Sequence, residues 1–193
     1  MPSSWNVEAE DPATVVRFAG GEIEIDTPAG VSVWLRQVLA SPVHISFEAM
    51  AVQRGGPNDH VSDLNAFWMA RNGDGTSVLA SPRSGAFGTY DNMLAYYVGI
   101  GGNRNTTTRF RRYIGRAGNR PLLPQHDLSE ERFLLQANVW TLVELVADGS
   151  TVQVWRDGDL ILDYNDPAPL NAGHFALRTT KSHLRIRNVR VMR

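Results

Sequence analysis

The chain has 193 residues, of which 42% are hydrophobic and 20% are charged. This length suits one domain with a sizeable core, so residues 1–193 are expected to form a single domain. The net charge of −1 excludes a general attraction to nucleic acid or to an anionic membrane surface, and no apolar run approaches the roughly 20 residues of a membrane span. Because cysteine is absent, disulfides, cysteine metal ligands and cysteine nucleophiles are also excluded.

Short alternating segments separated by glycine, serine and asparagine predict β-strands through the first half of the chain. The expected strands are 15–18, 22–26, 31–35, 43–52, 64–70 and 94–100. In 43–52, hydrophobic side chains share one face and polar side chains share the other. Before them, Met1–Asn6 lack a charged segment followed by an apolar stretch, so no signal peptide is expected in this chain.

The segment from Asn92 to His126 contains no aspartate or glutamate but six arginines. Strand alternation over 107–113 places four polar side chains on one face and turns Phe110 toward the core. The four are Thr107, Arg109, Arg111 and Tyr113. They predict a positive ridge that can hold carboxylates, because the planar guanidinium group binds a carboxylate through two parallel hydrogen bonds. The alternative is a solvated strand whose arginines pair with acids elsewhere in the chain.

The second half repeats the strand pattern with one expected exception. The expected strands are 139–147, 151–156, 160–164, 174–178 and 184–191. A helix is expected over Leu128–Leu135, with Ser129 as its N-cap and Glu130 and Glu131 in its first turn. Many short strands joined by regular turns in a domain of this size predict an all-β sandwich of two antiparallel sheets.

The C-terminal third carries the segments Trp140–Val146, Val152–Gly158 and Gly173–Arg178. These segments resemble the concanavalin-A-like jelly roll of lectins, laminin-G modules and several polysaccharide-degrading enzymes. The resemblance implies a jelly-roll β-sandwich, and it does not imply one chemistry because many functions share this fold.

The middle of the chain carries GGPNDHVSDLNAFWMA at 55–70, SPRSGAFGTYD at 81–91 and YYVGIGGNRNTTTRFRRY at 96–113. These segments resemble a family of secreted bacterial and fungal jelly-roll proteins that is distantly similar to polysaccharide lyases and to proteins of rhamnogalacturonan utilisation. The resemblance covers nearly the whole chain. It implies work on carbohydrate outside the cell, without a settled reaction.

A tyrosine beside arginines is the residue type that a polysaccharide lyase uses to remove the proton next to a uronate carboxylate. Consecutive tyrosines point to opposite faces of a strand, so one of Tyr96 and Tyr97 is expected to reach the ridge, where nearby positive charge would lower its pKa. Jelly-roll lyases of the alginate-lyase type combine Tyr with His, Arg and an amide. By that analogy of residue type, Tyr97 is expected to act as base and acid, with His183 or His60 assisting.

The other members of the expected catalytic site are Arg109 and Asn105, which would neutralise the uronate. Further subsites would be lined by Asn65, Asp63, Asn103, Arg111, Tyr113 and Arg178. The leading prediction is therefore a lyase that cleaves an acidic polysaccharide or oligosaccharide by β-elimination.

Other functions stay open. A non-catalytic carbohydrate-binding module would use the same groove, and an interaction domain of the laminin-G kind would bind no glycan. A glycoside hydrolase needs two positioned carboxylates. The acids Glu22, Glu24 and Asp26 share one strand face, but we expect this strand to be an exposed edge near the chain start rather than a catalytic one.

No cofactor is expected, with one open question about calcium. No HxH or HExxH spacing exists, so a zinc site is not predicted. Asn58, Asp59 and Asp63 are candidate ligands for a structural calcium ion, although they do not follow the EF-hand pattern. The oligomeric state is left open.

Overall fold

The computed structural model describes residues 2–193, and fifteen β-strands run through this part of the chain. In chain order they are β1 (Trp5–Ala9), β2 (Val15–Ala19), β3 (Glu22–Thr27), β4 (Val31–Leu35), β5 (Leu39–Ala40), β6 (Val43–Ala51), β7 (Leu64–Asn72), β8 (Met93–Gly101), β9 (Thr107–Ile114), β10 (Asp127–Leu128), β11 (Thr141–Asp148), β12 (Thr151–Arg156), β13 (Asp159–Asn165), β14 (Ala172–Thr179) and β15 (Ser182–Met192). Short helical turns are η1 (Pro2–Ser4), η2 (Val78–Ala80), η3 (Phe87–Tyr90), α1 (Gly102–Asn105), η4 (Pro124–His126) and η5 (Glu131–Phe133). None of the described helical turns has the length and apolar character needed to cross a membrane.

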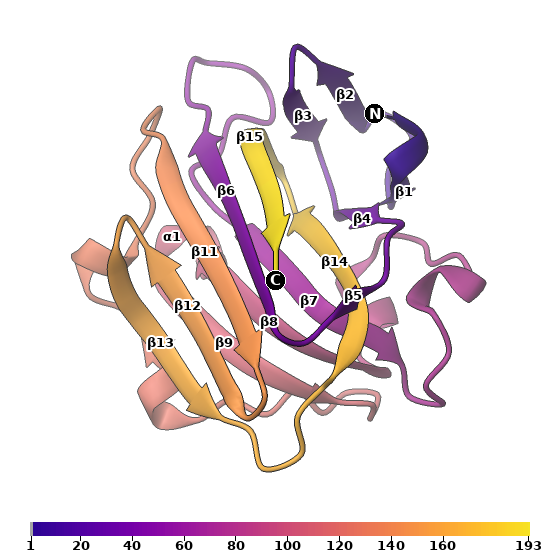
Figure 1. The fold of residues 1–193 in the computed structure, drawn as a ribbon. Helices are drawn as coiled ribbons and strands as arrows, with labels where there is room; N and C mark the ends of the chain where they lie inside the picture. Colours follow the sequence, from indigo (N-terminus) through magenta and orange to yellow (C-terminus); the bar gives the residue numbers. More distant parts are fainter. Residues whose placement is uncertain (1) are drawn as a thin grey trace.

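The strands form two antiparallel sheets packed face to face. The eight-stranded sheet has the order β1-β4-β14-β7-β8-β9-β10, with β5 also paired to β14. The seven-stranded sheet has the order β13-β12-β11-β6-β15-β3-β2. In Figure 1, β13, β12, β11, β6 and β15 lie in front of β14, β7, β8 and β9. The predicted all-β sandwich of two antiparallel sheets is confirmed.

The main core lies between the sheets and follows from the period-two alternation of the strands. Phe47 and Val143 enter it from the seven-stranded sheet. Trp68, Tyr96 and Phe110 enter it from the eight-stranded sheet, with ring centroids 5.5 to 6.3 Å apart. Full burial of one side chain of this size contributes roughly 1.5–3 kcal/mol to folding, so these alternating positions fix which face of each strand is outward.

A second, smaller core covers part of the outer face of the eight-stranded sheet. It combines strand residues with residues of the connection between β7 and β8, and contains Trp34, Phe67, Ala70, Val78, Tyr90, Met93, Ala95, Tyr97, Tyr113 and Ala176. Beneath it Glu8 is buried, and it accepts hydrogen bonds of 2.8 Å from both Trp34 Nε1 and Tyr90 Oη. The connection thus closes most of this face and leaves open the end over β8 and β9.

Leu128–Leu135 does not form the predicted helix. Asp127–Leu128 is the short strand β10, paired with β9, and Glu131–Phe133 is a single 3₁₀ turn. Thr108 on β9 donates a hydrogen bond of 2.6 Å to the carbonyl oxygen of Phe133. Long-range contacts of this kind hold the segment extended against the sheet and override its local helical preference.

The prediction that the acidic strand 22–26 is an exposed edge is also wrong. This strand is β3, and it lies inside the seven-stranded sheet between β15 and β2. Its acids are tolerated there because cations on the neighbouring strands stand opposite them: Arg17 faces Glu24 across β2, and Arg185 faces the same residue across β15.

Candidate functional site

A row of five polar residues and one glycine, which we call the polar row, crosses the outer face of the eight-stranded sheet at one end of the second core. Strand register aligns one residue from each of β4, β14, β7, β8, β9 and β10. The row is Ser32, Arg178, Asn65, Gly99, Arg109 and Asp127. Neighbouring strands lie about 4.8 Å apart, so the backbone positions of the two arginines, three strands from each other, are separated by about 14 Å.

The open part of this face is a hollow of about 310 Å³ over β8 and β9, which we call the arginine pocket. Its lining residues are Asp63, Phe87, Tyr97, Gly99, Gly102, Asn103, Thr107, Arg109, Arg111 and Arg120. The structure therefore brings together five of the predicted site residues, namely Asp63, Tyr97, Asn103, Arg109 and Arg111. Of the predicted subsite residues, Tyr113 is placed differently: it is fully buried in the second core.

The floor of the arginine pocket is open because position 99 is glycine. A Cβ atom on Gly99 would lie 2.8 Å from Tyr97 Oη and 3.0 Å from Asn65 Oδ1. Asn65 is 2% exposed, and its Oδ1 atom has no hydrogen-bond partner within residues 2–193. A buried acceptor without a partner is costly, so this atom is available to a ligand that donates a hydrogen bond into the pocket.

The rim of the pocket is a left-handed turn between β8 and β9. Asn103, Arg104 and Asn105 all have φ values between 52° and 59°, a region that costs an L-residue roughly 1 kcal/mol or more. Asn105 holds the turn in place: its Nδ2 atom donates to Leu135 O and its Oδ1 atom accepts from Leu135 N, each at 2.9 Å. Both polar atoms of the Asn105 side chain thus take part in positioning the rim, and its predicted role at a substrate stays a prediction.

Acids on both sides of the acid-free segment neutralise three of its six arginines. Asp127, the first residue after the segment, takes two hydrogen bonds from Arg109, at 2.7 and 3.0 Å. Asp91, the last residue before it, pairs with Arg120 at 3.3 Å. The inward-facing Arg112 donates to Asp166 at 2.9 Å. The alternative of arginines paired with acids from elsewhere is thus correct for these three.

Arg111 differs from the paired arginines of the same segment. Its Nη1 atom donates to the carbonyl oxygen of Arg120, and no carboxylate within residues 2–193 forms an ion pair with it. Partial burial lowers the pKa of Arg111. The pocket thus contains one guanidinium group whose charge the described chain leaves without a counter-ion.

The tyrosines do not have the properties expected of a catalytic base. Tyr97 faces the pocket and Tyr96 faces the core, as alternation predicts, but burial raises the pKa of Tyr97 instead of lowering it. Burial likewise raises the pKa of Tyr113 to about 12. Desolvation outweighs the nearby guanidinium charge, because a phenolate is poorly stabilised inside an aromatic cluster. The prediction of a lowered tyrosine pKa is wrong.

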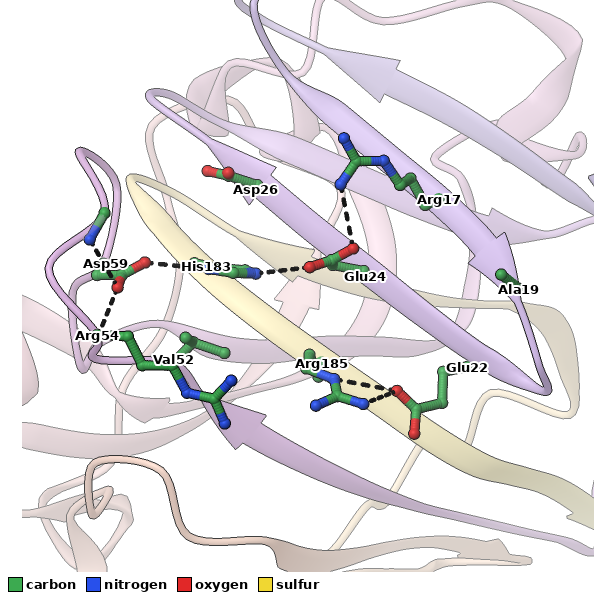
Figure 2. A pocket seen from close by; sticks show the side chains of 11 residues that line it. Arg17, Ala19, Glu22, Glu24, Asp26, Val52, Arg54, Asp59, His183 and Arg185 are labelled. Atoms are coloured by element: carbon green, nitrogen blue, oxygen red, sulfur yellow. Dashed lines mark hydrogen bonds and ion pairs between the residues drawn. The ribbon is translucent and has the colours of Figure 1, made fainter.

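His183 lies on the opposite side of the molecule from Tyr97. It is on β15 of the seven-stranded sheet, and Figure 2 shows its ring between two carboxylates. Its Nδ1 atom is 3.0 Å from Asp59 Oδ1, and its Nε2 atom is 2.9 Å from Glu24 Oε1. His60, the other predicted assistant, is exposed in the connection between β6 and β7. The predicted catalytic group of Tyr97, His183, Arg109 and Asn105 is therefore not assembled.

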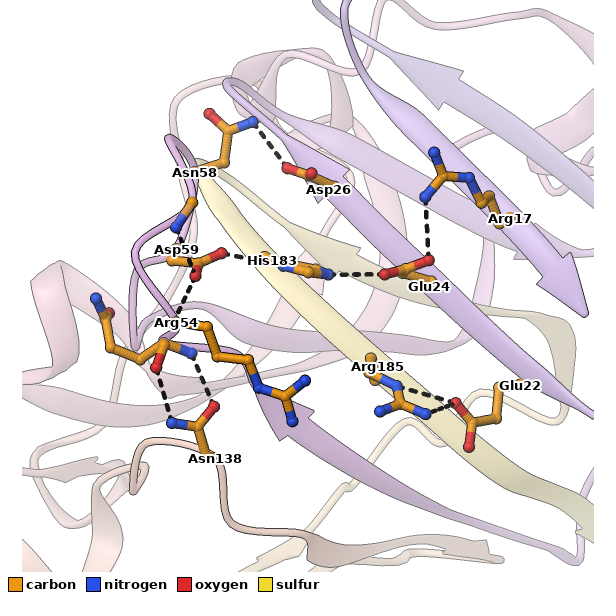
Figure 3. Close-up of polar contacts among 12 residues, drawn as sticks. Arg17, Glu22, Glu24, Asp26, Arg54, Asn58, Asp59, Asn138, His183 and Arg185 are labelled. Carbon is orange, nitrogen blue, oxygen red and sulfur yellow. Dashed lines mark hydrogen bonds and ion pairs between the residues drawn. The ribbon is translucent and has the colours of Figure 1, made fainter.

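The neighbourhood of His183 is a second hollow, of about 460 Å³, on the outer face of the seven-stranded sheet. We call the acids of this hollow and their partners the His183 cluster, and Figure 3 shows that each acid has a local partner. The contacts are those of Glu24 with Arg17 and His183, Glu22 with Arg185, Asp26 with Asn58, and Asp59 with His183 and backbone N–H groups. The cluster has equal numbers of acids and of basic groups (Arg17, Arg54, His183 and Arg185) along its lining.

Hydrogen bonding holds two carboxylates of the His183 cluster in their charged form. The hydrogen bond from His183 lowers the pKa of Glu24 against the opposing effect of burial, with a smaller contribution from Arg17. Burial of Asp59 opposes its ionisation, but the backbone N–H groups of Arg54 and Gly56, together with His183, outweigh burial and lower the pKa of Asp59.

The candidate calcium ligands are engaged with protein groups. Asp59 Oδ2 accepts from the backbone nitrogen of Arg54 at 2.6 Å, and Asp63 Oδ2 accepts from Ser62 Oγ at 2.6 Å and Thr180 Oγ1 at 2.8 Å. Across residues 2–193, no three histidine, aspartate or glutamate side chains are grouped as metal ligands would be. Calcium binding stays a prediction.

Two pocket residues come from connections whose position the sequence did not predict. Phe87 is delivered by the connection between β7 and β8, and Arg120 by the connection between β9 and β10. Their contact, with the Arg120 guanidinium carbon 4.4 Å from the Phe87 ring centroid, closes one side of the pocket. Strand periodicity does not predict where a connection folds over a sheet. The only signal in the sequence was the pair of glycines, Gly85 and Gly88, close to Phe87, which indicates a turn in the connection between β7 and β8.

Solved structures with this fold span nearly the whole chain. A protein of unknown function with a galectin-like fold from Bacillus subtilis is 15% identical, with a TM-score of 0.73 over 98% of this chain and 89% of that chain. The carbohydrate binding module CBM66 from Bacillus subtilis is 10% identical, with a TM-score of 0.65 over 98% and 96%. The exoplasmic/lumenal domain of VIP36, in its Ca²⁺/Man3GlcNAc-bound form, is 11% identical, with a TM-score of 0.64 over 100% and 84%. At such identities the likeness establishes the jelly-roll fold alone.

At the level of sequence, no curated protein matches the chain. Residues 25–189 match the family model DUF6250, described as a domain of unknown function. The matched region runs from β3 to β15 and includes every residue of the arginine pocket. The chain therefore belongs to the DUF6250 family.

Proposed function

We propose that this domain binds an acidic oligosaccharide in the arginine pocket and does not cleave it. The observation that carries the proposal is the half-buried guanidinium group of Arg111, which lacks a carboxylate partner in the described chain. A carboxylate of the ligand would supply the missing counter-charge through charge-assisted hydrogen bonds, which are about twice as strong as neutral ones.

The remaining pocket groups suit the hydroxyl groups and ring of a sugar. Asn65 Oδ1 offers an unpartnered acceptor and Tyr97 Oη offers a hydroxyl over the same glycine. The exposed amide of Asn103 stands at the rim, and Phe87 offers an apolar wall for the C–H face of a sugar ring. A few convergent polar groups beside an aromatic surface are the usual composition of a small-molecule site.

Proteins of the same fold support a carbohydrate ligand. CBM66 is a carbohydrate binding module, and the VIP36 domain is seen with Man3GlcNAc. The sequence resemblance to secreted jelly-roll proteins supports the same ligand class and an extracellular location, which stays a prediction.

The raised pKa of Tyr97, the expected catalytic base, favours binding without cleavage over β-elimination. A lyase base must give up its proton near the working pH, whereas burial raises the pKa of Tyr97. The lining of the arginine pocket contains no histidine, and its one carboxylate, Asp63, is already held by Ser62 and Thr180. The pocket thus contains groups that bind a uronate and no group poised to remove its proton.

The test is calorimetric titration with oligomers of galacturonate, glucuronate and mannuronate, with their methyl esters, and with neutral oligosaccharides. We expect measurable affinity for an acidic oligomer, weaker affinity for its ester, and no rise in the ultraviolet absorbance of an unsaturated product. Tyr97→Phe is expected to keep affinity within about fivefold, the value of one neutral hydrogen bond. Product formation that Tyr97→Phe abolishes would restore the lyase hypothesis, and the absence of any glycan binding would favour an interaction domain.

A further inference from the structure

Arg178 is a buried cation with unused hydrogen-bonding capacity. It lies on β14, is 1% exposed, and donates through Nη1 to Ser32 Oγ at 2.9 Å and to Gly85 O at 2.8 Å. Its Nε and Nη2 atoms have no partner within residues 2–193. Because a charge without a partner is expensive to bury, a group of this kind calls for a specific explanation.

The two unused atoms form the edge of the guanidinium group that binds carboxylates. In the same polar row, Arg109 uses its own Nε and Nη2 atoms to hold the two oxygens of Asp127, at 2.7 and 3.0 Å. Arg178 presents the same pair of donors, and no acceptor within residues 2–193 pairs with either of them. A side-on carboxylate is the ligand that satisfies both donors at once.

Aromatic rings cover Arg178 in place of a counter-ion. Its guanidinium carbon lies 4.8 Å from the ring centroid of Phe87 and 4.9 Å from that of Tyr90. The charge of Glu10 acts on Arg178, but the two side chains form no ion pair. Both lie beside Gly30: a Cβ atom added there would be 2.8 Å from Glu10 Oε2 and 3.1 Å from Arg178 Nη2. Ring contacts of this kind attract the cation, but they leave its Nε and Nη2 atoms without a hydrogen-bond acceptor within residues 2–193.

Phe87 separates Arg178 from the arginine pocket. The ring lines the pocket, contacts Arg120 on the pocket side at 4.4 Å, and contacts Arg178 beneath the second core. It stands on a 3₁₀ turn of the connection between β7 and β8. Its side chain is only partly buried, unlike the fully buried rings of Phe67 and Tyr90 in the same core.

We propose that Arg178 is a second anion subsite of the arginine pocket, which a ligand carboxylate reaches when the Phe87 ring turns aside. The ligand would then be an oligosaccharide with at least two carboxylates, laid across β9, β8, β7 and β14. One carboxylate pairs with Arg111 and another with Nε and Nη2 of Arg178, while Asn65 and Gly99 lie under the sugar between them. This inference rests on the proposed function and specifies the charge pattern of its ligand.

The first experiment observes Arg178 directly. In the ¹⁵N-labelled wild-type protein, the Nε–H signal of Arg178 is followed by NMR while trimers of galacturonate, glucuronate or mannuronate, or their methyl esters, are added. We expect the acidic trimer that binds to shift this signal and slow its hydrogen exchange, with no such change from the ester. Movement of the Arg111 signal without that of Arg178 overturns the second subsite and leaves the proposed function intact. No binding of any acidic trimer overturns both.

The second experiment truncates Phe87, the side chain that separates Arg178 from the arginine pocket. Phe87→Ala is expected to weaken binding of the ester, because an apolar wall of the pocket is lost. It is also expected to raise the ratio of acidic-trimer affinity to ester affinity about tenfold, because the ring no longer has to be displaced before a carboxylate reaches Arg178. Leu79→Ala truncates another residue packed on the second core and serves as the matched control, with unchanged affinity. Equal effects of the two substitutions, or equal changes for trimer and ester, contradict the gating role of Phe87. A Glu10→Gln variant that binds the trimer like wild type excludes Glu10 as the group that competes for Arg178.

Discussion

The two outer faces of the sandwich hold their charges differently. On the seven-stranded sheet, His183 lies between Glu24 and Asp59, and the acids of its cluster all have local partners. On the eight-stranded sheet, neither Arg111 nor Arg178 has a carboxylate partner in the described chain. The charges of the first arrangement are neutralised within the chain, whereas our proposal assigns the neutralisation of the second to a carboxylate of a ligand. A hollow alone does not distinguish them, since the larger of the two belongs to the first arrangement.

The largest expected loss of ligand affinity comes from a substitution that fills the floor of the arginine pocket, and it tests whether the eight-stranded sheet carries the binding site. Gly99→Val places a side chain where even a Cβ atom is 2.8 Å from Tyr97 Oη, so affinity for the acidic oligosaccharide should fall about 100-fold or more. Valine is favourable in a strand, and the fold should be retained. Gly88→Val, at a position with open space, is the control in the same calorimetric titration. Unchanged affinity in Gly99→Val would place the ligand elsewhere.

The next effect concerns the unpaired guanidinium group. Arg111→Gln should weaken binding of the acidic oligosaccharide by about 10- to 100-fold, since hydrogen bonds to a charged group contribute roughly 1.5–3 kcal/mol. Its matched control is Arg185→Gln, which breaks the pair with Glu22 on the opposite sheet and should leave affinity unchanged. Comparable losses in both variants would show that net charge, and not the pocket, attracts the ligand.

A third substitution tests whether the His183 cluster contributes to stability and not to ligand binding. His183→Gln removes the contacts to Glu24 and Asp59 and should lower the free energy of unfolding by roughly 1–2 kcal/mol, measured by denaturant titration. Ligand affinity should stay at the wild-type value, because the cluster lies on the other face. A loss of affinity without a loss of stability would indicate that the His183 cluster is the binding site.

The smallest effect is a pH dependence of stability. The pKa values of Glu24 and Asp59 are lowered from 4.5 and 3.8, so in this range the unfolded chain binds more protons than the folded one. Their stabilisation is present above those values and is lost as pH falls through the folded pKa values. In His183→Gln the pKa values move back toward the ordinary ones, so the fall in unfolding free energy below about pH 4.5 should be shallower than in wild type. An equally steep fall in both proteins would contradict the role of His183.

The sequence predicted much of the fold and the direction of the ridge side chains. Alternation over 107–113 correctly placed Phe110 inward and Arg109 and Arg111 outward. Alternation also predicted that Tyr96 and Tyr97 face opposite ways, but it left open which of the two faces the pocket. It failed at 128–135, where contacts with β9 replace a helix. Local preference decides an element only when no stronger long-range contact competes with it.

The candidate site was only partly predictable because its residues come from separate elements. Charge counting identified the acid-free arginine segment, but not that Asp91 and Asp127, its immediate neighbours, neutralise Arg120 and Arg109. Residue type suggested His183 as a partner of Tyr97, and the topology placed the two on opposite sheets.

The sequence by itself thus determined the antiparallel strands and the inward or outward direction of their side chains, because both follow from a two-residue period and the burial of apolar groups. The tertiary structure alone decided which charges are neutralised. Ion pairing depends on which strands become neighbours and on where connections fold, and both are long-range outcomes of packing. This is why the lack of a carboxylate partner at Arg111 and Arg178 became identifiable only in the folded chain.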